Sequence, residues 1–259
     1  MALPKIGYPT YELELPSNGK TIKYRPFVVK EEKVLLLTLE GEPNTPRDLN
    51  NLDLILEYEK EVEKWESDVK RSVKELIKNC VISRIKVDDL PTFDLEYLFL
   101  NIRAVSISDD IKITVTCKDD GTTQVPVTIN VDDIKVTKPE GHTNKIMLTD
   151  DTGIIMKYPS MDRFIDQEFI GKEIKTDEIF EFIAGHIDQI FDSENVYDSS
   201  SSTKKEMIDW VEHLTTAQFE KIQDFYITMP KLEHTVTVTN PKTGVETEYT
   251  IKGMSSFFV

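Results

Sequence analysis

Cysteine is scarce in this sequence, because its 259 residues include only Cys80 and Cys117. Two scattered thiols provide no disulfide framework and are typical of a reducing compartment. The 4 histidines are equally uninformative, since none stands at the spacing of a helical metal-binding motif or beside a cysteine. We therefore predict no metal centre and no cofactor.

Long hydrophobic runs are absent as well. No stretch of about 18 consecutive apolar residues occurs, which argues against a membrane-spanning helix. Residues 1–10 contain no basic stretch followed by an apolar run, so we expect no signal peptide. These absences predict a protein that has no membrane partner.

Positive charge is in short supply, with 31 lysines and arginines against 47 aspartates and glutamates, a net charge of −16. Such an acidic chain is repelled by phosphate, so nucleic acid is a poor candidate partner. The excess of acid can serve solubility alone. It can also form an acidic face that meets a basic partner, and the composition leaves both interpretations open.

The motifs of common catalytic sites are missing too. There is no glycine-rich phosphate loop and no G-x-S-x-G elbow for a nucleophile. Residues 151–153 spell the Asp-Thr-Gly of aspartic proteases, but they read more simply as a turn between strands. We predict no catalytic residues and no small-molecule substrate. We therefore expect a protein that is not an enzyme. The alternative from a different functional class is a metal-dependent or hydrolytic enzyme.

What the sequence does contain is enough apolar material for a core, 39% of residues, in alternating and helical patterns. We predict an α+β fold in which helical clusters pack on short antiparallel β-hairpins. The expected domains are 1–140 and 141–259, with a soft boundary near 139–141. Hairpins are expected at 11–24, 111–131, 145–158 and 234–251; helices at 28–39, 47–79, 93–104, 160–169, 176–191, 204–213 and 216–227; and a flexible, serine-rich surface loop at 198–203.

The helix predicted over 47–79 has apolar residues at spacings of three and four and a second face rich in glutamate and lysine. The simpler interpretation is an amphipathic helix with a solvated charged face. Because its apolar stripe is narrow over 57–67, the alternative is a helix that pairs with a helix of a partner protein.

The hairpins at 111–131 and 234–251 resemble each other. The segment 113–117, ITVTC, parallels 236–240, VTVTN, and Gly121 and Gly244 follow at the same offset. Strands have similar compositions, so a true internal repeat stays open.

Both hairpins have the outline of a zinc ribbon, in which each turn carries a C-x-x-C pair for one tetrahedral ion. The corresponding positions here are Cys117 and Asp120 in one turn and Asn240 and Thr243 in the other. A single thiol does not make a structural zinc site. These positions are therefore predicted to be degenerate knuckles without metal, held by hydrogen bonds instead.

Five features follow one another along the chain: the opening at 1–6, the first hairpin with 24–27, the long acidic helix, the ribbon at 114–117 and the ending at 251–258. Taken in this order, they resemble the baseplate hub subunit family of T4-type bacteriophages, and the resemblance covers most of the chain. Many members of that family place C-x-x-C-G at the ribbon turns, and this chain departs from the pattern, which puts metal binding in doubt.

The resemblance implies a structural protein of the virion tail baseplate, made and assembled in the host bacterial cytoplasm. Its implied partners are other baseplate, hub and tail proteins of the phage, with self-association left open. The alternative within the family is an assembly chaperone of the hub that is absent from the finished particle. Phe257, Phe258 and Val259 are either folded onto the chain's own core or anchored in a neighbouring subunit.

Overall fold

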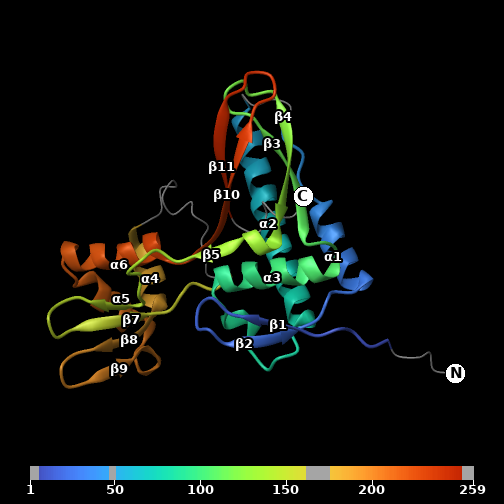
Figure 1. Ribbon diagram of the computed structural model, residues 1–259. Helices are drawn as coiled ribbons and strands as arrows, with labels where there is room; N and C mark the ends of the chain where they lie inside the picture. Colours follow the sequence, from blue (N-terminus) through green and yellow to red (C-terminus); the bar gives the residue numbers. More distant parts are fainter. Residues whose placement is uncertain (1–5, 47–50, 162–175, 253–259) are drawn as a thin grey trace. The chain divides into compact units, whose positions relative to one another are not determined.

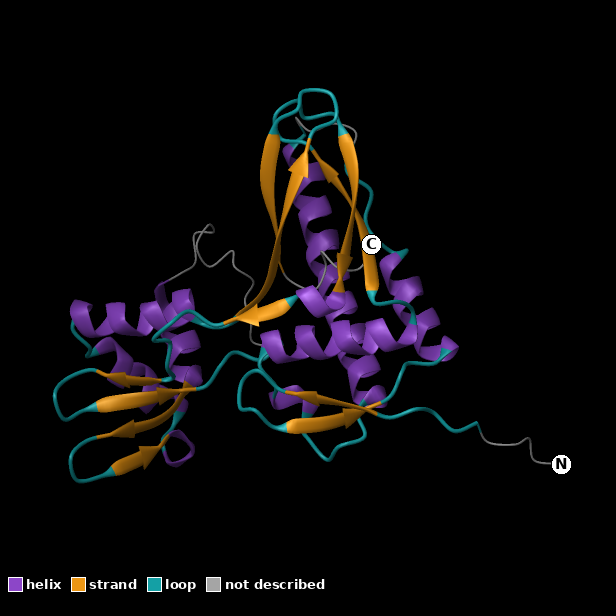
Figure 2. Ribbon diagram, in the orientation of Figure 1, coloured by secondary structure: helices purple, strands orange, loops and turns teal. Residues whose placement is uncertain are grey.

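The structure is a computed structural model that describes residues 6–46, 51–161 and 176–252 (Figures 1 and 2). It contains helices and short antiparallel hairpins, which confirms the predicted α+β class. Contacts divide the chain into two compact units, residues 1–136 with 232–259, and residues 137–231. The last hairpin thus belongs with the first unit rather than with the preceding helices. The predicted division into the domains 1–140 and 141–259 stays a prediction.

The first unit opens with the antiparallel strands β1 (Tyr11–Glu14) and β2 (Thr21–Tyr24), followed by helix α1 (Val29–Leu39), which confirms the predicted hairpin and helix. Arg25 holds the two oxygens of Glu31 at 2.7 and 3.0 Å and donates to the carbonyl of Asn79 at 2.9 Å. This bidentate pair ties the start of α1 to the end of the long helix.

The long helix α2 (Leu52–Cys80) begins at Asn51, whose side chain accepts from the backbone N–H of Asp53 at 3.1 Å. This cap satisfies a donor that the first turn leaves free. Helix α3 (Thr92–Ser106) follows the short η1 (Val87–Asp89) and begins directly after Pro91. The side chains of α3 that face the core are fully or almost fully buried: Phe93, Leu95, Leu98, Phe99, Leu100 and Ile102.

Two further hairpins belong to this unit. Strand β3 (Asp110–Thr116) pairs with β4 (Gln124–Asn130), and β10 (Lys231–Thr239) pairs with β11 (Glu246–Lys252), with β5 (Lys135–Thr137) on the other side of β10. The short η2 (Val131–Asp133) leads from β4 to β5. The bases of these hairpins share one apolar cluster with α3, formed by Leu100, Ile111, Ile113, Ile129, Val131, Ile134, Leu232 and Ile251.

The second unit is an antiparallel sheet with helices on it. Its strands lie in the order β6 (Lys145–Met147), β7 (Gly153–Met156), β8 (Ile187–Phe191) and β9 (Val196–Asp198). Figure 2 shows the helices of this unit together on one side of the strands. The helices are α4 (Thr176–His186), α5 (Lys204–Glu212) and α6 (Thr216–Thr228), with the short η4 (Ser199–Ser201) before α5.

The predicted helix over 176–191 is wrong in its last part, because the helix ends at His186 and 187–191 is strand β8. The apolar residues of this segment fit a helical spacing, so periodicity did not mark the change. Pairing decides it, since Ile190 lies opposite the fully buried Ile154 in the sheet. β-Branched side chains suit such a half-buried strand.

The predicted loop over 198–203 is partly structured: β9 ends at Asp198, whose side chain accepts from the N–H of Ser200 at 2.9 Å and starts η4. Most of the helix predicted over 160–169 lies outside the described residues. Within the described part of the chain, no helix is both long and apolar enough to cross a bilayer.

Candidate functional site: the paired hairpin turns

The turns that follow β3 and β10 have the same backbone arrangement. The N–H of Gly121 donates to the carbonyl of Cys117 at 2.9 Å, and the N–H of Gly244 donates to the carbonyl of Asn240 at 2.8 Å. Both glycines are left-handed, with φ of 66° and 75°. Glycine adopts this conformation without a steric penalty. The likeness seen in the sequence is therefore a likeness of turn geometry.

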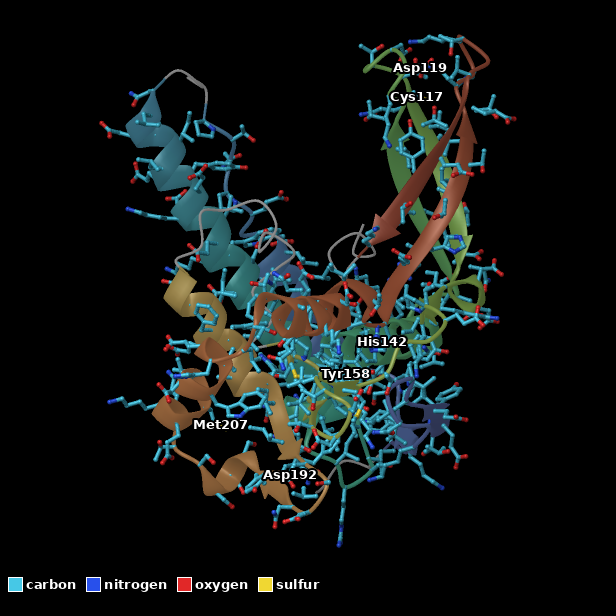
Figure 3. All side chains as sticks on the ribbon, turned by 90° about the vertical axis from the view of Figure 1, so that its left-hand side faces the viewer. Cys117, Asp119, His142, Tyr158, Asp192 and Met207 are labelled. Carbon is cyan, nitrogen blue, oxygen red and sulfur yellow. The ribbon has the colours of Figure 1, made fainter. Side chains whose placement is uncertain are left out.

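The two turns meet, although more than a hundred residues separate them in the sequence. The side-chain amide of Asn240 donates to both carboxylate oxygens of Asp119 at 3.0 Å, and the hydroxyl of Thr243 donates to the same carboxylate. Figure 3 shows Cys117 and Asp119 at the end of their hairpin, beside the turn of the other hairpin. One carboxylate of the first turn thus accepts hydrogen bonds from both knuckle positions of the second turn.

A second contact joins the hairpins next to these turns. The backbone N–H of Lys118 donates to the hydroxyl of Tyr249 at 2.8 Å, and the ammonium group of Lys118 lies 4.8 Å from the centre of the Tyr249 ring. Tyr249 belongs to β11, opposite Val236 of β10. The backbone of one turn is therefore fastened to a strand of the other hairpin, not only to its turn.

Asp120 acts within its own turn. Its carboxylate accepts from the N–H groups of Thr122 at 3.0 Å and Thr123 at 2.9 Å, and from the hydroxyl of Thr123. These bonds, led by the one from the Thr123 hydroxyl, hold the pKa of Asp120 far below its usual value. Hydrogen bonds from Thr243 and then Asn240 lower the pKa of Asp119 in the same way. Both carboxylates are ionised acceptors near neutral pH.

Cys117 is buried, with 2% of its surface exposed. Burial, followed by the charges of Asp119 and Asp120, raises the pKa of its thiol. A protonated thiol is a weak nucleophile and a weak metal ligand. Across residues 6–46, 51–161 and 176–252, no group of three or more His, Cys, Asp or Glu side chains is arranged to hold a metal ion. The absence of metal at the turns stays a prediction.

The structure brings the four knuckle positions proposed from the sequence, Cys117, Asp120, Asn240 and Thr243, to adjacent turns. Sequence reasoning missed the carboxylate at their centre, Asp119, because it lies between the knuckle positions rather than at one of them. Only its place in a turn beside a second turn would have singled it out. The three C-terminal residues proposed as an interface, Phe257, Phe258 and Val259, lie outside the described residues.

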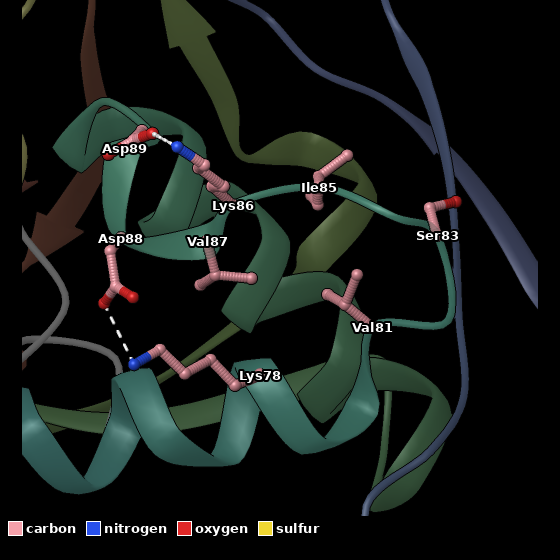
Figure 4. A pocket seen from close by; sticks show the side chains of 8 residues that line it. All are labelled: Lys78, Val81, Ser83, Ile85, Lys86, Val87, Asp88 and Asp89. Carbon is pink, nitrogen blue, oxygen red and sulfur yellow. Dashed lines mark ion pairs between the residues drawn. The ribbon is translucent and has the colours of Figure 1, made fainter.

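A pocket lies beyond the end of α2, with charged and apolar side chains on its walls (Figure 4). Asp88 binds Lys78 at 2.9 Å and Lys74 at 2.6 Å, and Lys86 binds Asp89 at 3.8 Å. The hydrogen bond from Lys74, followed by that from Lys78, lowers the pKa of Asp88. The charged groups of this pocket are engaged with one another, so its arrangement serves to hold the connection from α2 to α3.

In the second unit, His142 makes contacts of a structural kind. His142 contacts the hydroxyls of Thr228 and Tyr158, at 2.9 Å from one ring nitrogen each, and its ring lies 5.3 Å from that of Phe225. Figure 3 labels His142 and Tyr158. Burial, and then the charge of Lys138, lowers the pKa of His142. A neutral imidazole therefore ties the segment before β6 to helix α6.

Residues 8–259, nearly the whole chain, match the protein family described as T4 bacteriophage base plate protein. No curated protein and no solved structure matches the chain.

Proposed function

Because the chain belongs to the T4 bacteriophage base plate protein family, we propose that it is a structural component of the baseplate hub of a contractile phage tail. It acts by binding other baseplate, hub and tail proteins. The observation that carries this proposal is the family match over residues 8–259. In the proposal the protein is made in the host cytoplasm and ends in the virion.

The character of the described side chains supports a binding role. The charged and polar groups described at the turns and in the pocket bond with one another, and His142 bonds with Thr228 and Tyr158. Such mutual bonding is expected of a scaffold rather than of a reactive centre. Apolar side chains remain at the surface of α1, where Val29, Val34 and Leu37 are 79%, 52% and 57% exposed. Grouped apolar residues on a surface are typical of protein interfaces.

The test is quantitative mass spectrometry of purified phage particles, with a tail-tube protein as the internal standard. A small fixed copy number that is a multiple of three or six supports an integral baseplate component, because closed assemblies are symmetric. Absence from particles, together with abundance in the infected-cell lysate, overturns that role and supports an assembly chaperone of the hub.

The C-terminal interface is a separate part of the proposal. A chain that lacks residues 257–259 is expected to fold but to enter particles less often than the full chain. The aromatic anchors of an interface carry much of its binding energy. Loss of folding in this variant, measured by circular dichroism, assigns the three residues to the chain's own core instead.

A further inference from the structure

The two halves of helix α2 carry opposite charge. Residues 52–68 contain 7 acidic and 2 basic side chains, whereas residues 69–80 contain 1 acidic and 4 basic side chains. The basic half is packed in the core, where Val69, Val73, Leu76 and Ile77 are buried. The acidic half contributes no buried side chain. Packing within the chain therefore accounts for the basic half of α2 but not for the acidic half.

The acidic half has a seam of its own. Ile55, Tyr58, Val62 and Trp65 are half-buried, and every other side chain from 52 to 67 is exposed. These four follow one another in steps of three, four and three, which is the spacing of the a and d positions of a coiled coil. The buried Val69 continues the series. We call these four residues the α2 seam.

From residue 59 on, the positions that flank the α2 seam are all acidic. With Ile55 and Val62 at a, and with Tyr58 and Trp65 at d, the e positions are Glu59 and Glu66 and the g positions after the first turn are Glu61 and Asp68. The two lysines of this half, Lys60 and Lys64, lie at the outer positions f and c. Charge is therefore sorted around the helix, with negative charge beside the seam.

Helix α1 covers α2 only from the middle of the helix onward. The indole nitrogen of Trp65 donates to the carbonyl of Thr38 at 2.8 Å, and the hydroxyl of Thr38 lies 3.0 Å from that of Ser72. Because Thr38 is in the last turn of α1, the helix before Trp65 extends past it. Figure 3 shows this first half of α2 apart from the hairpins β3–β4 and β10–β11. At its start, Leu52, Leu54 and Leu56 are 68%, 42% and 45% exposed.

We propose that residues 52–68 of α2 dock an amphipathic helix of another protein, one with an apolar stripe flanked by lysine or arginine. Opposite charges at e and g select the partner in a helix pair, and like charges exclude it. A second copy of this chain presents the same acidic flanks and is disfavoured. Residues 253–259 of the chain carry no charged side chain, so they do not match the acidic flanks either.

The seam sets the length of the partner. From Ile55 to Trp65 the seam rises about 15 Å, since each residue adds about 1.5 Å. Two heptads of this kind bind weakly by themselves, and they suit a contact that works together with others in an assembly. The inference rests on the proposed function, which it deepens by naming the kind of partner.

The test uses the full chain and synthetic three-heptad peptides with leucine at a and d. One peptide has lysine at e and g, and the comparison peptide has glutamate there. Calorimetry at about 0.15 M salt keeps distant charges screened. The lysine peptide is expected to bind about tenfold more tightly than the glutamate peptide, as charged flanks set partner choice.

Two double variants with the same change in net charge separate the seam from the overall field. Glu59→Lys with Glu66→Lys reverses the flanks and is expected to weaken the lysine peptide about tenfold. Glu57→Lys with Glu63→Lys changes the outer positions and is expected to weaken it about twofold, because only screened, longer-range attraction is lost. Circular dichroism checks that both variants keep their helix content.

Equal binding of the two peptides, or equal effects of the two double variants, overturns the proposal. So does a chain that self-associates through the seam, seen as a dimer in sedimentation that Val62→Asp converts to a monomer. Binding of the lysine peptide only after residues 253–259 are removed also overturns it, because the chain's own end then occupies the seam. These outcomes leave the particle measurement untouched, so the proposed function can stand when this inference fails.

Discussion

The turns after β3 and β10 share a backbone but not a chemistry. Each places a left-handed glycine four residues after its first knuckle position, with the same hydrogen bond back to that position. The first turn supplies a thiol and two carboxylates, and the second supplies an amide, a hydroxyl and a proline. In the side-chain bonds between the two turns, Asp119 of the first therefore accepts, and Asn240 and Thr243 of the second donate. Two turns that are alike in shape hold together because they differ in their side chains.

The comparison also separates what lies within a turn from what lies between turns. Asp120 accepts hydrogen bonds from Thr122 and Thr123 of its own turn, while its neighbour Asp119 accepts from Asn240 and Thr243 of the other turn. Asn240 is 1% exposed, so the hydrogen bonds of its side chain are shielded from solvent. A metal ion would need ligands that converge from all four knuckle positions. Here a single carboxylate, that of Asp119, joins the two turns.

The largest expected effect comes from making the turns alike. Asp120→Cys, Asn240→Cys and Thr243→Cys, together with the native Cys117, place thiolates at the knuckle positions of both turns. This triple variant is expected to bind one zinc ion per chain, measured by plasma mass spectrometry of the purified protein. Structural zinc contributes about 10 kcal/mol or more to folding, so a chelator should lower its melting temperature strongly.

The same triple variant with Cys117→Ser provides the matched control, because it keeps the changes but loses one thiolate. It is expected to hold zinc much more weakly. A triple variant that binds no zinc contradicts the view that the turns approach each other as ribbon knuckles do.

The next largest effect is expected at Asn240, which is compared here with Cys117, the equivalent position of the other turn. Asn240→Ala removes a buried donor from the Asp119 carboxylate and is expected to lower the free energy of unfolding by about 1–3 kcal/mol. Cys117→Ala removes one buried sulfur and is expected to cost about 1 kcal/mol. Urea unfolding of both variants measures the difference. A larger loss for Cys117→Ala than for Asn240→Ala reverses the assignment of the stabilising contacts.

A smaller and equal effect is expected at the glycines. Gly121→Ala and Gly244→Ala each force an L-residue into the left-handed region, which costs about 1–2 kcal/mol. An added Cβ meets no atom within 4 Å at either position, so strain is the only penalty. Thermal unfolding should give matching shifts for the two variants, and unequal shifts show that the turns differ in backbone as well.

Gly153→Ala serves as a steric control for that pair. Its added Cβ would lie 2.7 Å from the carbonyl oxygen of Ile146 and would collide with the ring of Phe191. The loss of stability at this position should therefore exceed that at the two turn glycines, although φ at Gly153 is not positive.

The smallest effect is a dependence on acid that only the first turn has. The folded-state pKa values of Asp119 and Asp120 lie below those of the unfolded chain. Their contribution to stability is therefore complete above about pH 4, the ordinary pKa of aspartate, and is lost as the pH falls through the folded-state values.

Asp119→Asn tests this dependence, since it keeps the shape of the side chain but does not titrate. The difference in melting temperature between the parent chain and this variant should shrink as the pH falls below about 4. A difference that stays constant below about pH 4 means that the Asp119 carboxylate does not carry the acid response.

Alternation and turn residues located most hairpins correctly. Tyr11–Glu14 and Thr21–Tyr24 flank a Ser-Asn-Gly turn, and both are strands of one hairpin. Strand β8 escaped the same reasoning, because Ile187 and Ile190 fit a helix and a strand equally well by spacing. The partner strand β7, which buries Ile154 beside them, made the choice.

The candidate site followed the same division. Its glycines and knuckle positions were visible in the sequence, because a turn between alternating strands is a local feature. The role of Asp119 was not visible, because its donors come from residues 240 and 243. Likewise the α2 seam and its acidic flanks are visible in the spacing of residues, but only packing against α1 reveals where the buried part of the stripe begins.

The sequence by itself determined the α+β class, the helices with strong apolar stripes and the hairpins with their glycine turns. These depend on interactions between residues close together in the chain. Tertiary structure alone decided that the last hairpin returns to the first unit, that Asp119 joins the two turns and that α2 is buried over only half its length. Each of those outcomes depends on contacts between distant residues, whose pairing no local pattern encodes.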